Sequence, residues 1–134
     1  MLITSEEEML RLGEKFANEI LPPLTIELIG DVGAGKTTFV RGLAKGLGVK
    51  DELSSPSFTI SRSYSGEKAD LVHYDFYRLQ DPGIMMEDLA ESISDPAVIT
   101  VIEWGQSTQG ILPENRKIIT IKYIDENSRE VEIK

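Results

Sequence analysis

A glycine-rich octapeptide, GDVGAGKT at residues 30–37, is the segment of this sequence whose residue types point most directly to a chemistry. It matches the pattern G-x-x-x-x-G-K-[ST], the Walker A or P-loop signature. Glycines let the backbone take positive φ angles, so that consecutive N–H groups can surround phosphate oxygens. We expect the Lys36 ammonium to reach the β and γ phosphates of a nucleotide and the Thr37 hydroxyl to bind Mg²⁺. The alternative is a glycine-rich turn that caps a helix and binds nothing.

Two acidic residues could complete such a site, because a nucleotide hydrolase needs a carboxylate that holds Mg²⁺ or orients water. Glu103 follows the apolar run VITVI at residues 98–102, which is the layout of a Walker B strand. Asp75 follows LVHY at residues 71–74, a second strand candidate. The alternatives are that Glu103 is only the polar end of a strand and that Asp75 is a surface residue or a helix cap.

The sequence favours ATP over GTP as the nucleotide. Guanine-specific proteins carry an N-K-x-D motif that reads the base and a D-x-x-G switch motif, and neither occurs in this chain. Asp31 and Asp81 come closest to the second pattern, and both fail on the spacing. ATP is therefore predicted by elimination.

The predicted elements place the octapeptide between a strand and a helix, as a P-loop requires. Residues 24–29 form an apolar strand, and a helix runs from about residue 36 to residue 47. Gly42 and Gly46 lie inside this helix, where glycine is unfavourable, so we expect close packing against the sheet. Further elements are a capped helix that begins at Ser5, an extended segment at 58–64, a strand at 70–77, a helix at 81–92, a strand at 97–102, and a hairpin of strands 117–124 and 129–133.

These elements and the Walker A motif predict one α/β domain over residues 1–134. We expect a P-loop NTPase-like, three-layer domain with a mixed, mainly parallel central sheet and a C-terminal β-hairpin.

Composition excludes several other classes of protein. The chain has no cysteine, which rules out disulfides, thiolate zinc sites and a cysteine nucleophile, and one histidine cannot form a metal cluster. Its formal net charge of −9 argues against direct binding of a nucleic acid backbone. The N-terminal segment is acidic rather than basic and no membrane-length apolar run occurs, so a soluble, cytoplasmic protein without membrane contact is predicted.

Four segments after the Walker A motif resemble the bacterial TsaE (YjeE) family in order and content. The family patterns are approximately S-P-T-[FY]-T, H-x-D-x-Y-R-L, [VI]-E-W and L-P. The chain has SPSFT at 55–59, HYDFYRL at 73–79, IEW at 102–104 and GILP at 110–113. It departs from the family in Ser57, where threonine is usual, and in lacking the usual E-x-x-G-x-x-[ED]-[YL] run before Asp95.

The resemblance implies an ATPase that uses ATP and Mg²⁺ and works with two other proteins, TsaB and TsaD. Together they support the formation of N6-threonylcarbamoyladenosine beside the tRNA anticodon. In that family TsaD carries the transferase chemistry and the small ATPase binds the TsaB–TsaD heterodimer. Contact with tRNA would therefore be indirect, through the partners.

The resemblance also implies roles for individual residues. Lys36, Asp75 and Glu103 would be catalytic, and Asp75 would aid hydrolysis. Thr37 and Glu103 match the Mg²⁺ ligands, and Ser55 to Thr59 would be a switch segment. The phosphate cradle would comprise Gly33, Ala34, Gly35, Lys36, Thr37 and Thr38.

Three further residues have open interpretations. Trp104 could line the nucleotide site or belong to the core, and Arg129 on the terminal hairpin could cover the nucleotide. His73 is interpreted as a structural histidine with its hydrogen bonds satisfied.

Two other functions use the same Walker A motif. One is a small-molecule kinase, although so short a chain leaves little room for an acceptor site or a lid. The other is a nucleotide-switched regulatory module without useful hydrolysis. No arginine stands out as a finger that could act within the chain, so hydrolysis stimulated by a partner is predicted.

Overall fold

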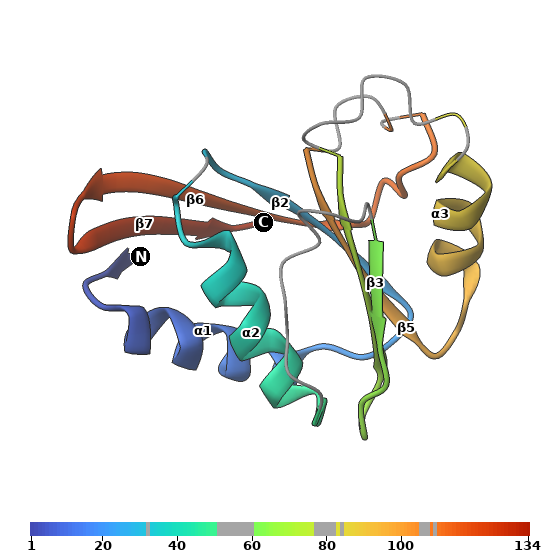
Figure 1. Cartoon of the computed structure of the whole chain (residues 1–134), viewed down its shortest axis with the longest axis horizontal. Coiled ribbons are helices and arrows are strands. Elements are labelled where there is room, and N and C mark those ends of the chain that lie inside the picture. Colours follow the sequence, from blue (N-terminus) through green and yellow to red (C-terminus); the bar gives the residue numbers. More distant parts are fainter. Residues whose placement is uncertain (32, 51–60, 77–82, 84, 105–107, 109) are drawn as a thin grey trace.

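The computed structural model describes residues 1–31, 33–50, 61–76, 83, 85–104, 108 and 110–134. Within these residues seven strands form one sheet in the order β1-β7-β6-β2-β5-β4-β3 (Figure 1). The central strands β6, β2, β5 and β4 are parallel, whereas the β1–β7, β6–β7 and β3–β4 pairs are antiparallel. The strands are β1 (Leu2–Ile3), β2 (Leu24–Ile29), β3 (Ser61–Tyr64), β4 (Asp70–Asp75), β5 (Val98–Glu103), β6 (Lys117–Asp125) and β7 (Ser128–Ile133).

In the described part of the chain three helices cover the two faces of this sheet, which confirms the predicted layered α/β fold. The helices are α1 (Glu6–Glu19), α2 (Lys36–Gly46) and α3 (Met85–Ser94). Figure 1 shows α1 and α2 together on one side of the sheet and α3 on the other. The apolar residues divide accordingly into a larger cluster beneath α1 and α2 and a smaller one beneath α3.

Helix α1 begins as the sequence predicts. The Ser5 hydroxyl caps it by accepting a hydrogen bond from the Glu8 N–H at 3.1 Å, and the first turn is acidic, which suits the positive end of a helix. Its buried side chains, such as Met9 and Phe16, recur at helical spacing and face the larger cluster.

The glycines of α2 allow a close approach to α1, which corrects the predicted packing against the sheet. A Cβ atom at Gly42 would lie 2.1 Å from the carbonyl oxygen of Leu10, and one at Gly46 would lie 2.5 Å from the Cβ of Ala17. Both contacts are with α1, so α2 packs tightly against α1. The predicted close packing of Gly42 and Gly46 is confirmed, but they pack against α1 and not against the sheet.

Helix α3 is joined to the strands beneath it by two polar contacts, one part-buried and one buried. The Tyr74 hydroxyl on β4 donates a hydrogen bond to Asp88 Oδ2 at 2.6 Å. The hydroxyls of Ser92 on α3 and Thr100 on β5 lie 2.7 Å apart. The predicted beginning of this helix, at residues 81–82, lies outside the described residues.

The predicted C-terminal hairpin is confirmed as β6 and β7, joined by a turn in which the Asn127 N–H bonds to Asp125 Oδ1 at 2.9 Å. Strand β1 was not predicted. It pairs with β7 along the edge of the sheet, with Leu2 beside Glu130 and Ile3 beside Arg129. No helix in the described part of the chain is long and apolar enough to cross a membrane.

Candidate phosphate-binding site

The described residues of the octapeptide lead from the end of β2 into the first turn of α2, as the motif requires. Gly33 and Gly35 have φ angles of 83° and 103°, which favour glycine over residues with side chains. Gly35 is the N-cap residue of α2, so the helix N-terminus opens directly onto the loop. A Cβ atom built on Gly33 meets nothing within 4 Å, so space is open at this point of the loop.

Lys36 lies at the centre of the site and is only 7% exposed. Its Nζ donates a hydrogen bond to the Gly30 carbonyl oxygen, which spans the base of the loop. The same atom lies 3.6 Å from Glu103 Oε1 and 4.1 Å from the centre of the Trp104 ring. The ammonium is therefore held between a carboxylate and an aromatic face.

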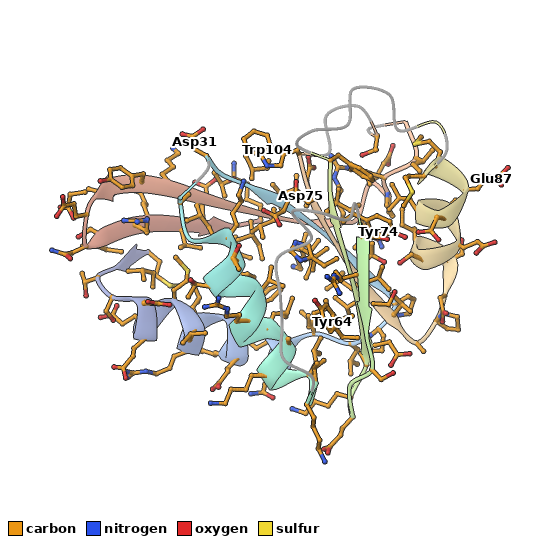
Figure 2. The ribbon with its side chains drawn as sticks, in the orientation of Figure 1. Asp31, Tyr64, Tyr74, Asp75, Glu87 and Trp104 are labelled. Atoms are coloured by element: carbon orange, nitrogen blue, oxygen red, sulfur yellow. The ribbon has the colours of Figure 1, made fainter. Side chains whose placement is uncertain are left out.

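Glu103 and Asp75 are brought to the same edge of the sheet. They end β5 and β4 and are direct neighbours in the parallel pairing of these strands. Glu103 is 4% exposed, whereas Asp75 is partly exposed. Figure 2 shows Asp75 and Trp104 along the edge at which Asp31 of the loop also lies. In open α/β sheets the carboxyl ends of the strands are the usual place for ligand binding.

His73 is a residue of this site that sequence reasoning missed. Its Nε2 forms a hydrogen bond with Glu103 Oε2, and it is 1% exposed. Its Nδ1 is buried and has no partner among the described residues, so these residues supply one of the two hydrogen bonds expected for a structural histidine. The signal was the spacing from His73 to Asp75, which places both on one face of a strand.

Of the two interpretations of Trp104, the structure shows the packing against the core, and the role at a nucleotide stays a prediction. It packs against the smaller apolar cluster and also covers the Lys36 ammonium. Its φ of 58° is unusual for a residue with a side chain and turns the chain sharply after Glu103.

Arg129 reaches the loop from β7. Its Nε donates to the Ala34 carbonyl oxygen at 3.1 Å, and one Nη donates to the Gly33 carbonyl oxygen at 3.3 Å. The structure therefore places Arg129 against the backbone carbonyls of the loop.

The remaining residues of the predicted site fall into two groups. Thr37 and Thr38 are partly exposed in the first turn of α2, next to Lys36. The predicted switch residues, Ser55 and Thr59, lie outside the described residues.

The donor set fits a Mg²⁺–nucleotide complex better than a metal bound by protein alone. Among the described residues no three His, Cys, Asp or Glu side chains form a group that could hold a metal ion. Mg²⁺ is commonly held by one or two protein ligands together with substrate phosphates. Glu103 and the Thr37 hydroxyl are oxygen donors of this kind, and the glycine loop beside them offers N–H groups for the phosphates.

Comparisons with known proteins agree on one family. A family model described as "Threonylcarbamoyl adenosine biosynthesis protein TsaE" matches residues 3–131. The "tRNA threonylcarbamoyladenosine biosynthesis protein TsaE" of Haemophilus influenzae is 36% identical over 136 residues, covering 98% of this chain and 85% of that protein. The protein of the same name from Aquifex aeolicus is 36% identical over 135 residues, covering 99% and 93%. The crystal structure of Bacillus subtilis YdiB superposes with a TM-score of 0.80 at 30% identity, covering 98% of this chain and 80% of that one.

Proposed function

Because the chain belongs to the TsaE family of tRNA threonylcarbamoyladenosine biosynthesis, we propose that it is the ATP-binding and ATP-hydrolysing subunit of that system. The observation that carries this proposal is the convergence of the glycine loop, the buried Lys36 ammonium and the carboxylate of Glu103 at one edge of the sheet. We propose a cytoplasmic setting, where the tRNA substrate is found.

The residues of the site have different proposed roles in binding the nucleotide and Mg²⁺. The loop N–H groups and the Lys36 ammonium bind and orient the phosphates, and the positive end of α2 adds to their field. Glu103 and Thr37 would hold Mg²⁺, which when bound offsets the charge of the phosphate oxygens. Binding requires the Lys36 ammonium to exchange its contact with Glu103 for contacts with phosphate. The hydrogen bond from His73 keeps the Glu103 carboxylate in place during that exchange.

Asp75 is proposed to orient the attacking water or accept its proton. It lies beside Glu103 at the end of the neighbouring strand, close to the metal ligand without being part of the loop. Catalysis of phosphoryl transfer consists mainly of positioning and charge stabilisation, so a carboxylate in this place acts on the rate more than on binding.

TsaB and TsaD are the proposed partners, and tRNA would be reached through them. Several arginines are engaged elsewhere: Arg41 lies 3.8 Å from Glu6, Arg116 lies 2.8 Å from Glu27, and Arg129 contacts the loop carbonyls. We therefore propose slow hydrolysis by the isolated chain and faster hydrolysis in the complex, where a cation supplied by a partner is worth about 10³–10⁵ in rate.

Single-turnover hydrolysis of ATP, with and without the TsaB–TsaD heterodimer and tRNA, tests the proposal. The expected result is release of phosphate to water that the heterodimer accelerates, together with modification of the tRNA. Phosphate transferred to a metabolite would support a small-molecule kinase. Tight ATP binding without hydrolysis in any assembly would support a regulatory module.

A further inference from the structure

We propose that Arg129 is a positioning residue that holds the phosphate-binding loop in its binding conformation from behind, so that the C-terminal hairpin is part of the nucleotide site without touching the nucleotide. This inference rests on the proposed ATP binding and replaces the expectation that Arg129 lines the nucleotide.

The pairing of the strands places Arg129 on the loop side of the sheet. Arg129 is registered between Ile3 on β1 and Tyr123 on β6. Alternate residues of a strand share a face, and Val131, two positions on, is buried in the cluster beneath α1 and α2. The Arg129 side chain therefore leaves the sheet on the face that carries α2 and the loop before it.

The guanidinium of Arg129 is fixed by its own hairpin before it reaches the loop. One Nη donates to the carbonyl oxygens of Asp125 at 2.6 Å and Ser128 at 2.9 Å. The guanidinium carbon lies 4.6 Å from the centre of the Tyr123 ring. The guanidinium then directs its remaining N–H groups to the loop. Because it is already fixed, forming these hydrogen bonds costs little side-chain conformational entropy.

The loop atoms that Arg129 contacts are carbonyl oxygens, which determines its role. The Ala34 carbonyl and the Gly35 N–H belong to one planar trans peptide and point in opposite directions. A donor fixed on the Ala34 carbonyl therefore turns the Gly35 N–H away from the hairpin, towards the side where phosphates bind. Gly33 and Gly35, on either side of Ala34, have positive φ angles and little intrinsic preference for this arrangement. The hydrogen bonds from Arg129 to the carbonyl oxygens of Gly33 and Ala34 stabilise this conformation of the loop.

The test compares two probes, ATP and inorganic tripolyphosphate, by calorimetry on the isolated full chain. A residue that orders the loop affects both probes, whereas a residue that contacts the nucleoside affects ATP alone. For Arg129→Gln we expect both affinities to fall by a similar factor of about ten, for the loss of two hydrogen bonds to the loop. The rate of single-turnover hydrolysis at saturating ATP should stay within about twofold of the unmodified chain.

Two further variants separate positioning from charge and from folding. Lys122→Gln removes the same charge from an exposed position of the same hairpin and should leave both affinities unchanged. Arg129→Lys keeps the charge and the apolar stem but cannot bond to the hairpin and both loop carbonyls at once, so it should lose affinity for both probes as well. It serves as the test if Arg129→Gln does not fold.

Three outcomes would overturn the inference: a loss confined to ATP, unchanged affinities, or full rescue by lysine. Failure of the unmodified chain to bind either probe would instead refute the proposed ATP binding.

Discussion

Asp75 lies directly beside Glu103 in the parallel pairing of β4 and β5, so two acidic residues occupy the same level at the end of neighbouring strands. Their surroundings differ. Glu103 is buried and contacts Lys36 and His73, whereas Asp75 is partly exposed. Under the proposed function Glu103 would act at the metal and Asp75 at the water, and substitutions should separate these two roles.

Substitution of Lys36 by alanine should abolish most nucleotide binding. The loop keeps its N–H groups but loses the charged donor, which is worth about 1.5–3 kcal/mol, or about tenfold to a hundredfold in affinity. Titration with a fluorescent ATP analogue measures this. Lys45→Ala is a matched control, because Lys45 lies on the same helix but is exposed and pairs with Glu14. Equal affinity of the Lys36 variant and the control would refute the P-loop assignment.

Substitution of Glu103 by glutamine should preserve the fold and raise the Mg²⁺ concentration needed for half-maximal hydrolysis by about tenfold or more. The amide keeps the size of the side chain and an oxygen that can accept the hydrogen bond from His73, but it lacks the negative charge. Mg²⁺ titrations of ATP hydrolysis in the TsaB–TsaD complex give the result. Glu132→Gln, at an exposed position, is the control. An unchanged metal dependence would mean that Glu103 is not a ligand.

Substitution of Asp75 by asparagine should slow hydrolysis in the complex by about 10²–10⁴ while ATP binding stays within about twofold. The change removes a base or water-orienting group and leaves the loop and Lys36 intact. Single-turnover rates and ATP titrations on the same preparation separate the two effects. A parallel loss of binding would assign Asp75 to the metal site instead.

Trp104 should report nucleotide binding directly. It is the only tryptophan in the chain, and its ring covers the Lys36 ammonium. When Lys36 moves to phosphate, the cation leaves the ring and the environment of the indole changes, so the emission spectrum should shift on addition of ATP and Mg²⁺. In Lys36→Ala the shift should disappear. Emission that does not respond to saturating ATP would show that Lys36 keeps its place on binding.

Tyr74 should make stability sensitive to alkaline pH. Burial, together with the hydrogen bond to Asp88, raises the pKa of the Tyr74 hydroxyl well above its ordinary value of 10.0. The folded state therefore keeps this proton more tightly than the unfolded chain does. The stabilisation is complete below about pH 10 and is lost as the pH rises further.

Tyr74→Phe tests this. It should cost about 1 kcal/mol at neutral pH through the lost hydrogen bond and should flatten the decline of stability above pH 10. Urea unfolding across pH 7–11 measures both effects, with Tyr123→Phe, at an exposed position, as the control. The same steep decline in both variants would mean that another group causes it.

The features that sequence predicted well are local. Strand β2, the loop and the start of α2 follow from an apolar run, a set of glycines and a helix pattern that are contiguous in the chain. The hairpin of β6 and β7 is equally local, because a short turn joins strands that pair with each other. Glu103 ends β5, as its place after an apolar run predicts, whereas its buried contact with Lys36 was not predicted.

The features that sequence did not predict depend on contacts between distant segments. Strand β1 has only two residues, too few for a periodic pattern, and exists because β7 offers a free edge. The glycines of α2 indicated a close approach, but their sequence carries no information on whether a helix or a sheet makes it. The contact of His73 with Glu103 was not predicted, because the two residues are 30 positions apart in the sequence.

The pairing of Ile3 with Arg129 has a consequence for synthesis of the protein on the ribosome. The phosphate-binding loop is synthesised early. The Arg129 side chain, which donates hydrogen bonds to the carbonyl oxygens of this loop, becomes available only when residue 129 has left the exit tunnel. Until then β1 lacks its neighbouring strand and the loop lacks its support. Nucleotide binding should therefore be acquired only after the hairpin has emerged and paired, and a nascent chain that stalls before the hairpin should bind ATP poorly even though every residue of its Walker A motif is present.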